Sequence, residues 1–221
     1  MTKPIVQIGI AILPFCLSPL QANPPSGWVM AGSKPTEYDA NIDPQAAYAG
    51  QPSVHIKSIK PPTGFGSMLQ CFRGEQYFGK RIRFSANVKS AGIDEYGDWA
   101  GLWYRADKGT QWLAFDNMQD RPIKGASAWR NYEVVLDIPH DSTGSCFGIL
   151  LAGSGSVWIN SVKLEVVSIK VPVTGHSSIR AMLSTFRCQN EWIFGCPMDS
   201  EAPVLGRSPR PEGPKNLGFD K

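Results

Sequence analysis

The chain has 221 residues, which suits one domain with appendages. Hydrophobic residues make up 42%, enough for a packed core, so a chain disordered throughout is excluded. The formal net charge is only +3, and the longest basic run is "KRIR" at 80–83, so there is no basic stripe and we expect no nucleic-acid partner.

The first 22 residues have the pattern of a secretory signal peptide. Lys3 supplies the positive start, "IVQIGIAILPFCLSPL" is the apolar region, and cleavage is expected after Ala22. Pro14 and Pro19 interrupt the apolar run, which argues against a membrane anchor. We therefore expect a periplasmic or secreted protein with no membrane span in the mature chain, whose charge falls to +2 because Lys3 is removed.

Cysteine usage agrees with export. The mature chain keeps four cysteines, an even number that favours disulfides in an oxidising compartment: Cys71, Cys146, Cys188 and Cys196. Of the three possible connectivities, 71–146 with 188–196 would join strand to strand and tail to tail. Four buried free thiols are the alternative. No pair has C-x-x-C spacing, so we expect no zinc site, and nothing calls for a cofactor.

The region 53–167 has the pattern of many short strands without an amphipathic helix. The clearest, 80–90, places Ile82, Phe84, Ala86 and Val88 on one face with polar residues opposite. "GILLAG" is apolar at successive positions, as in a central strand covered on both sides or one that bends through a bulge. The expected strands are 53–59, 66–72, 80–90, 99–107, 111–117, 130–138, 145–153 and 156–167. This pattern predicts a mostly β protein, an antiparallel β-sandwich of the jelly-roll kind.

The pattern ends at Ser168. The remainder is rich in Pro, Gly, Ser and Arg, which predicts an irregular, Cys-containing tail. The expected organisation is a signal peptide at 1–22, a β-sandwich binding module at 23–167 and the tail at 168–221.

The strand at 99–105 carries the best candidates for a binding surface. Trp99, Trp103 and Arg105 share one face by period two, and the opposite face, with Leu102 at its centre, is the more plausible core face. If Leu113 and Phe115 of the next strand are also core, Trp112 and Asp116 join the tryptophan-bearing face. The loop that follows adds the polar candidates Asn117, Gln119, Asp120 and Arg121.

Aromatic rings beside Asp, Asn, Gln and Arg suit sugar recognition. The rings stack on C–H patches, and the polar groups hydrogen-bond hydroxyls. We therefore expect a non-catalytic binding module for a glycan or another small polar ligand. The alternatives are that the tryptophans are core anchors and that Arg105 forms a structural ion pair with Asp116 or Asp120.

Catalysis is not expected. The three histidines have no triad or ligand spacing, and "GSGS" at 153–156 has the pattern of a hairpin turn rather than a nucleophile elbow. Two rival functions stay open: a structural or protein-interaction module with a partner in the cell envelope, and a glycan hydrolase. An interaction module predicts a buried Trp103, and a hydrolase predicts two carboxyls facing each other across a cleft.

Several segments of the chain resemble a known group of sandwiches. "GWVMAGSKPTEYDANID", "GFGSMLQCF", "WAGLWYRAD", "LAFDNMQDRPIKGASAW" and "FGILLAGSGSVWI" resemble the galactose-binding-domain-like jelly rolls, which include many carbohydrate-binding modules. More narrowly, they are similar to an uncharacterised bacterial module found alone or attached to helix-turn-helix regulators. The likeness covers roughly 27–167.

The resemblance has three implications. It supports a Cys71–Cys146 disulfide between two strands. Many such sandwiches carry a structural calcium ion, and Glu37, Asp39 and Asp43 are the acids that could bind one here. The acidic pair usual in the last strand of these sandwiches is replaced by Asn-Ser in this chain. Finally, "NLGF" near the end is typical of the start of such sandwiches. Residues 214–221 would therefore return to the edge beside "GW" at 27–28, as in a circular permutation, the alternative being a loose tail.

Overall fold

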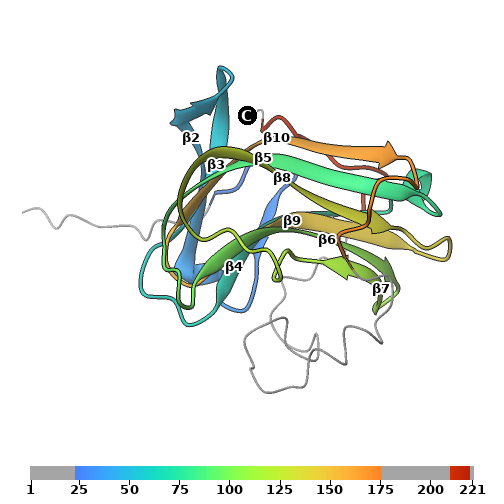
Figure 1. The fold of residues 1–221 in the computed structure, drawn as a ribbon, viewed down its shortest axis with the longest axis horizontal. Coiled ribbons are helices and arrows are strands. Elements are labelled where there is room, and N and C mark those ends of the chain that lie inside the picture. Colours follow the sequence, from blue (N-terminus) through green and yellow to red (C-terminus); the bar gives the residue numbers. More distant parts are fainter. Residues whose placement is uncertain (1–22, 176–209, 220–221) are drawn as a thin grey trace, which may run out of the picture.

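The computed structural model describes residues 23–175 and 210–219, and they form a β-sandwich of two antiparallel five-stranded sheets (Figure 1). The helical structure within these ranges is limited to two 3-10 turns, η1 (Pro35–Glu37) and η2 (Glu75–Tyr77). The strands are β1 (Val29–Ala31), β2 (Tyr38–Tyr48), β3 (Gln51–Ser58), β4 (Phe65–Phe72), β5 (Arg81–Ile93), β6 (Trp99–Lys108), β7 (Gln111–Asp116), β8 (Gly125–Asp137), β9 (Gly144–Ala152) and β10 (Ser156–Val167). The predicted fold class is confirmed.

Along the chain, the strands pass from one sheet to the other at every step except β2 to β3 and β6 to β7. Sheet A has the order β1-β4-β9-β6-β7, and sheet B has the order β2-β3-β10-β5-β8. Neighbouring strands are therefore mostly distant in sequence, and only the β2–β3 and β6–β7 pairs are formed by consecutive strands.

The main core lies between the sheets, because each strand turns one apolar face inward. The expected inner face of β5 is correct: Ile82, Phe84, Ala86 and Val88 are buried in it. Ala100, Leu102 and Tyr104 form the inner face of β6, also as expected. In the centre of sheet A, β9 is buried on both faces, which explains why "GILLAG" does not alternate.

A disulfide links two neighbouring strands of sheet A. Cys71 of β4 and Cys146 of β9 are paired residues and are bonded. Cys188 and Cys196, like the signal peptide at 1–22, lie outside the described residues, so these expectations stay predictions.

The segment 210–219 packs against the start of the sandwich. Trp28 Nε1–H donates to the carbonyl of Asn216 at 3.0 Å, and Lys215 exchanges two hydrogen bonds with the side chain of Gln70. Phe219 is buried in the main core, with its ring centroid 5.4 Å from that of Trp28. The returning segment expected from "NLGF" is therefore present at 215–219, beside β1.

Neither 3-10 turn approaches the length that a bilayer crossing requires, so the described part of the chain contains no helix able to span a membrane.

Candidate functional site

Trp99, Trp103 and Arg105 share the outer face of sheet A, as the alternation predicts. This face is packed: Trp103 is 3% exposed, and its Nε1–H donates to Ser67 Oγ at 2.8 Å. Leu69, Phe115, Cys146 and Leu150 are buried with Trp103 in a second apolar cluster, and Trp99 is partly buried against it. Stacking a ligand on Trp103 would require this cluster to open.

Arg105 forms a structural ion pair, although not with the two acids considered from the sequence. Its Nε lies 2.8 Å from Asp107 Oδ1, and its guanidinium lies 4.9 Å from the centroid of the Trp112 ring. Burial raises the pKa of Asp107, and the Arg105 charge opposes that rise. Arg105 is thus held between a carboxylate and an aromatic ring.

A β-bulge corrects the expected faces of β7. The register between β6 and β7 shifts between Ala106 and Asp107, so Phe115 lies opposite Arg105 on the outer face, and Asp116 lies opposite the inward-facing Tyr104. Trp112 joins the outer face as expected. Asp116 does not, and Phe115 is not part of the main core.

The polar loop after β7 uses its side chains largely within the fold. Asp116 Oδ1 accepts the N–H of Met118 at 2.8 Å, and Asn117 Oδ1 accepts the N–H of Gln119 at 3.2 Å. Arg121 donates to Asp116 at 2.6 Å and to Asp120 at 2.8 Å. Asn117 is buried, whereas Gln119 and Asp120 are exposed.

The same loop joins the two sheets. Asp116 Oδ2 accepts a 2.6 Å hydrogen bond from the hydroxyl of Thr174. The backbone N–H of Thr174 donates to the carbonyl of Val135 in β8, and the hydroxyl oxygen of Thr174 accepts the N–H of Val135. The loop is therefore a bridge from β7 of sheet A to β8 of sheet B. Ligand contact by the nine residues singled out from the sequence stays a prediction.

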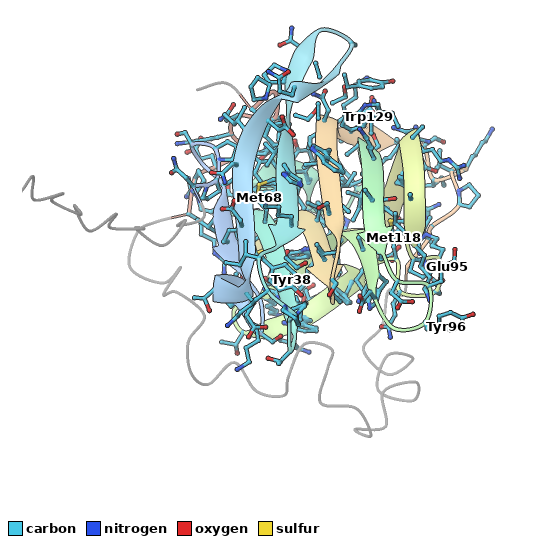
Figure 2. All side chains as sticks on the ribbon, turned by 90° about the vertical axis from the view of Figure 1, so that its left-hand side faces the viewer. Tyr38, Met68, Glu95, Tyr96, Met118 and Trp129 are labelled. Atoms are coloured by element: carbon cyan, nitrogen blue, oxygen red, sulfur yellow. A yellow bond between two sulfur atoms is a disulfide. The ribbon has the colours of Figure 1, made fainter. Side chains whose placement is uncertain are left out.

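The outer face of sheet B carries a different kind of surface, which faces the viewer in Figure 2. Its three strands β10, β5 and β8 place polar side chains side by side, because paired residues of antiparallel strands point to the same face. A pocket of about 440 Å³ lies over these strands, and we call it the arch pocket. It is lined by Tyr48, Arg83, Ser85, Asn87, Asn131, Glu133, Ser161, Lys163 and Glu165.

The floor of the arch pocket is built in rows across the sheet. Asn87 and Asn131 are paired and joined by a 3.3 Å hydrogen bond between their amides. In the next rows, the Nε of Arg83 lies 3.0 Å from the Oε2 of Glu133, while Glu165 lies opposite Arg83 in the register. Amides, hydroxyls and charges of both signs are therefore within reach of one ligand.

A bulge in β10 puts two of these charges on the outer face. Ile159 is buried in the core, and strict alternation from it would turn Lys163 and Glu165 inward. The register shifts by one residue between Asn160 and Lys163, and Ser161 has φ 53. Val162 is thereby buried, and Lys163 and Glu165 face outward.

The β2–β3 hairpin is held over this face by contacts at its base. Asp43 accepts the backbone N–H groups of Gln45 and Ala46, where the β2–β3 register becomes irregular, and its Oδ2 accepts Trp158 Nε1–H at 2.8 Å. Burial tends to raise the pKa of Asp43, but the bond from Trp158 and the backbone donors outweigh it, so this pKa is lowered. His55 stacks on Trp158 with ring centroids 4.4 Å apart, and burial lowers the pKa of His55.

The tip of the hairpin reaches the opposite edge of the sheet. Tyr48 comes from the end of β2 and Trp129 from β8, yet their ring centroids are 5.3 Å apart. Figure 2 shows Trp129 near the tip of this hairpin. The two aromatic rings thus form an arch at one end of the arch pocket.

The early acids considered for calcium are used elsewhere. Glu37 accepts the N–H of Thr63 at 2.6 Å, a bond that lowers its pKa, and Asp39 accepts the amide of Asn41 at 2.6 Å. Within 23–175 and 210–219, no three His, Cys, Asp or Glu side chains gather as metal ligands would.

Sequence reasoning missed the arch pocket. The polar face of 80–90 was visible as alternation, but its partners on β8 and β10 depend on strand order and on a bulge, which one sequence does not display. Tyr48 and Trp129 carry no pattern that links them, because they meet only through the fold of the hairpin.

Comparison with known proteins gives one relative in sequence and several in structure. The chain is 38% identical over 151 residues to the "Uncharacterized HTH-type transcriptional regulator YbfP" of Bacillus subtilis (strain 168). The match covers 67% of this chain and 50% of that protein, so the chain spans about half the length of its curated relative. No protein-family model matches the chain.

The solved structures that resemble it include carbohydrate-binding modules. The CBM22-1 xylan-binding domain of Paenibacillus barcinonensis Xyn10C has a TM-score of 0.49 at 10% identity and covers 66% of this chain and 90% of that one. TmCBM61, solved with β-1,4-galactotriose, has a TM-score of 0.46 at 14% identity, with coverage of 65% and 91%. A cyclase from Fischerella sp. TAU scores 0.47 at 13%, with coverage of 67% and 89%. These TM-scores lie below 0.5, so none of these likenesses assigns a ligand or a reaction to this chain.

Proposed function

We propose that this protein is a non-catalytic carbohydrate-binding module whose ligand lies in the arch pocket. The observation that supports this most directly is the composition of the pocket: a floor of amides, hydroxyls and paired charges, with an aromatic arch at one end. Saccharides present many hydroxyls that both donate and accept, together with C–H patches that pack on rings, and this lining offers partners for both.

A binding role fits the carboxylates better than hydrolysis does. Glu133 and Glu165 lie on strands separated by β5 and in different rows of the sheet, so their backbones are more than roughly 10 Å apart. Glu133 is paired with Arg83, and Glu165 lies in a different row of the sheet, so the two carboxylates are not directly opposite each other as a catalytic pair would be.

The test is a titration of the full chain with xylo-, galacto-, gluco- and manno-oligosaccharides and their polymers. Tryptophan fluorescence and calorimetry measure the binding. Asn131→Ala removes an exposed amide from the pocket floor, and we expect it to weaken binding by about tenfold, the loss of one good polar contact. Trp99→Ala, on the outer face of sheet A, is the matched control and should bind normally.

Each outcome has a clear meaning. Weakening by Trp99→Ala with Asn131→Ala unchanged would place the ligand on the face first singled out from the sequence. Absence of binding across the whole panel would overturn the carbohydrate proposal. Thermal unfolding of both variants checks that the fold is intact.

Export belongs to the same proposal. The Cys71–Cys146 bond supports it, because disulfides persist in oxidising compartments. Expression of the full chain in a secreting host, with N-terminal sequencing of the product, should show cleavage after Ala22. An uncleaved product retained in the cytoplasm would contradict export.

A protein partner in the envelope is the second candidate, and the burial of Trp103 favours it, since an interaction module predicts that burial. This hypothesis predicts no binding to any glycan of the panel. In intact cells it predicts cross-linking to one defined envelope protein. Saturable glycan binding lost in Asn131→Ala would decide against it as the main role.

A further inference from the structure

The arch pocket is closed at both of its ends along the strands. At one end, the Tyr48 ring meets the Trp129 ring above the sheet, with centroids 5.3 Å apart. Because the hairpin is anchored by Asp43 on Trp158 and by Asn160, whose amide donates to the carbonyl of Pro52 at 2.7 Å, this wall is part of the fold.

The other end is closed by the segment 168–174. It leaves β10 and crosses the end of β5, where the guanidinium of Arg81 donates to the carbonyls of Ile169 and Val171. Arg81 is itself fixed by two hydrogen bonds to Asp137, of 2.7 and 2.8 Å. The segment then reaches the edge of β8, where Thr174 pairs with Val135.

The burial of Val135 shows that this crossing covers the outer face. Val135 alternates with Glu133 and Asp137, so its side chain points to the same face as theirs, yet it is 0% exposed. Arg83 follows Arg81 on the outer face of β5, and Arg83 lines the arch pocket. The crossing segment therefore lies directly beyond the charged end of the pocket.

From these two walls we propose, building on the carbohydrate-binding function above, that the arch pocket takes the end of a glycan or a short free saccharide. The interior of a polysaccharide needs a groove open at both ends so that the chain can enter and leave. Here the floor is bounded by the arch and the crossing segment, and its volume of about 440 Å³ lies in the range of small-molecule sites. The ligand is a terminal polyhydroxylated unit approached from above the sheet.

The experiment measures how affinity depends on chain length. Whichever saccharide series of the panel binds is titrated into the full chain as oligomers of one to six units and as the polymer. We expect affinity to rise over the first two or three units and then stay level. Partial hydrolysis of the polymer should raise the number of binding sites in proportion to the chain ends created.

Removing a wall provides the second measurement. Tyr48→Ala takes away half of the arch, and we expect the affinity for the hexamer relative to that for the dimer to rise by roughly threefold or more, as new sugar units extend through the gap. Tyr96→Ala is the matched control, since Tyr96 is 98% exposed on the β5–β6 loop and lies outside the pocket lining.

The outcomes separate the two proposals. Affinity that keeps rising through the hexamer, or more than one protein bound per polymer end, would overturn end recognition and leave the binding function standing. Absence of binding to every saccharide would overturn both.

Discussion

Tyr48 and Trp129 are in contact although the sheet order places β2 and β8 at opposite edges of sheet B. The hairpin that carries Tyr48 therefore spans the outer face of β10 and β5. A long-range aromatic contact of this kind fixes the hairpin relative to the sheet, and it can be measured directly.

The first prediction concerns the strength of that contact. A double-mutant cycle with Tyr48→Ala and Trp129→Ala should give a coupling energy of about 0.5–1.5 kcal/mol in the free energy of unfolding, as for other aromatic pairs. Urea unfolding of the four proteins measures it. Strictly additive effects would show that the arch does not form in solution.

The disulfide between Cys71 and Cys146 should contribute strongly to stability. The two residues are 75 positions apart, so the bond closes a long loop in the unfolded chain, and its loss should lower the free energy of unfolding by about 4 kcal/mol. Cys71→Ala with Cys146→Ala, compared with the parent chain in urea, tests this. Equal midpoints would mean that the bond does not form.

The segment 210–219 should behave as part of the core. Phe219 is 1% exposed against Trp28, so Phe219→Ala should lower the free energy of unfolding by about 3–5 kcal/mol. Ile169→Ala, at an 81% exposed side chain, should change it by less than about 0.5 kcal/mol. A small effect of Phe219→Ala would contradict the packing of this segment.

His55 should make stability depend on pH. Burial lowers the pKa of His55 from its usual 6.5, so the unfolded chain takes up this proton more readily than the folded one. The stability associated with neutral His55 is therefore fully present above about pH 6.5 and is lost as the pH falls below it. His55→Phe keeps a ring on Trp158 and should flatten the dependence of the melting temperature on pH between about 5 and 7. An unchanged slope would assign the dependence to other groups.

Ser161 should behave as the extra residue of the bulge in β10. Its deletion leaves Val162 inward and Lys163 outward by strict alternation, the same faces as in the intact strand, so the fold should survive the deletion. Ser161→Gly keeps the residue at a positive φ and should be tolerated within about 1 kcal/mol. Loss of folding on deletion of Ser161, measured by thermal unfolding, would contradict this role of the bulge.

The sequence was sufficient for the fold class and for most strands, because their apolar faces follow a local period of two. The inner faces of β5 and β6 and the doubly buried β9 are examples. Alternation failed for Asp116, where a bulge in β7 itself reversed the face, and the position of a bulge depends on the partner strand as much as on the bulged one.

The pocket was beyond sequence reasoning for a related reason. Asn87 and Asn131 lie 44 positions apart and become neighbours only through the β5–β8 register. A tryptophan in the sequence does not by itself indicate whether its ring is buried or exposed. Trp103 was predicted to lie on an open surface and is packed. Trp129 was not among the predicted site residues, yet its ring meets Tyr48 at the end of the pocket.

The contact between Trp28 and Asn216 joins residues 188 positions apart in the chain. Phe219 covers the Trp28 ring from the same segment, and Lys215 holds the side chain of Gln70. Truncation of residues 210–219 would therefore bare the ring of Trp28 to water and leave the indole N–H of Trp28 and the amide of Gln70 without these partners.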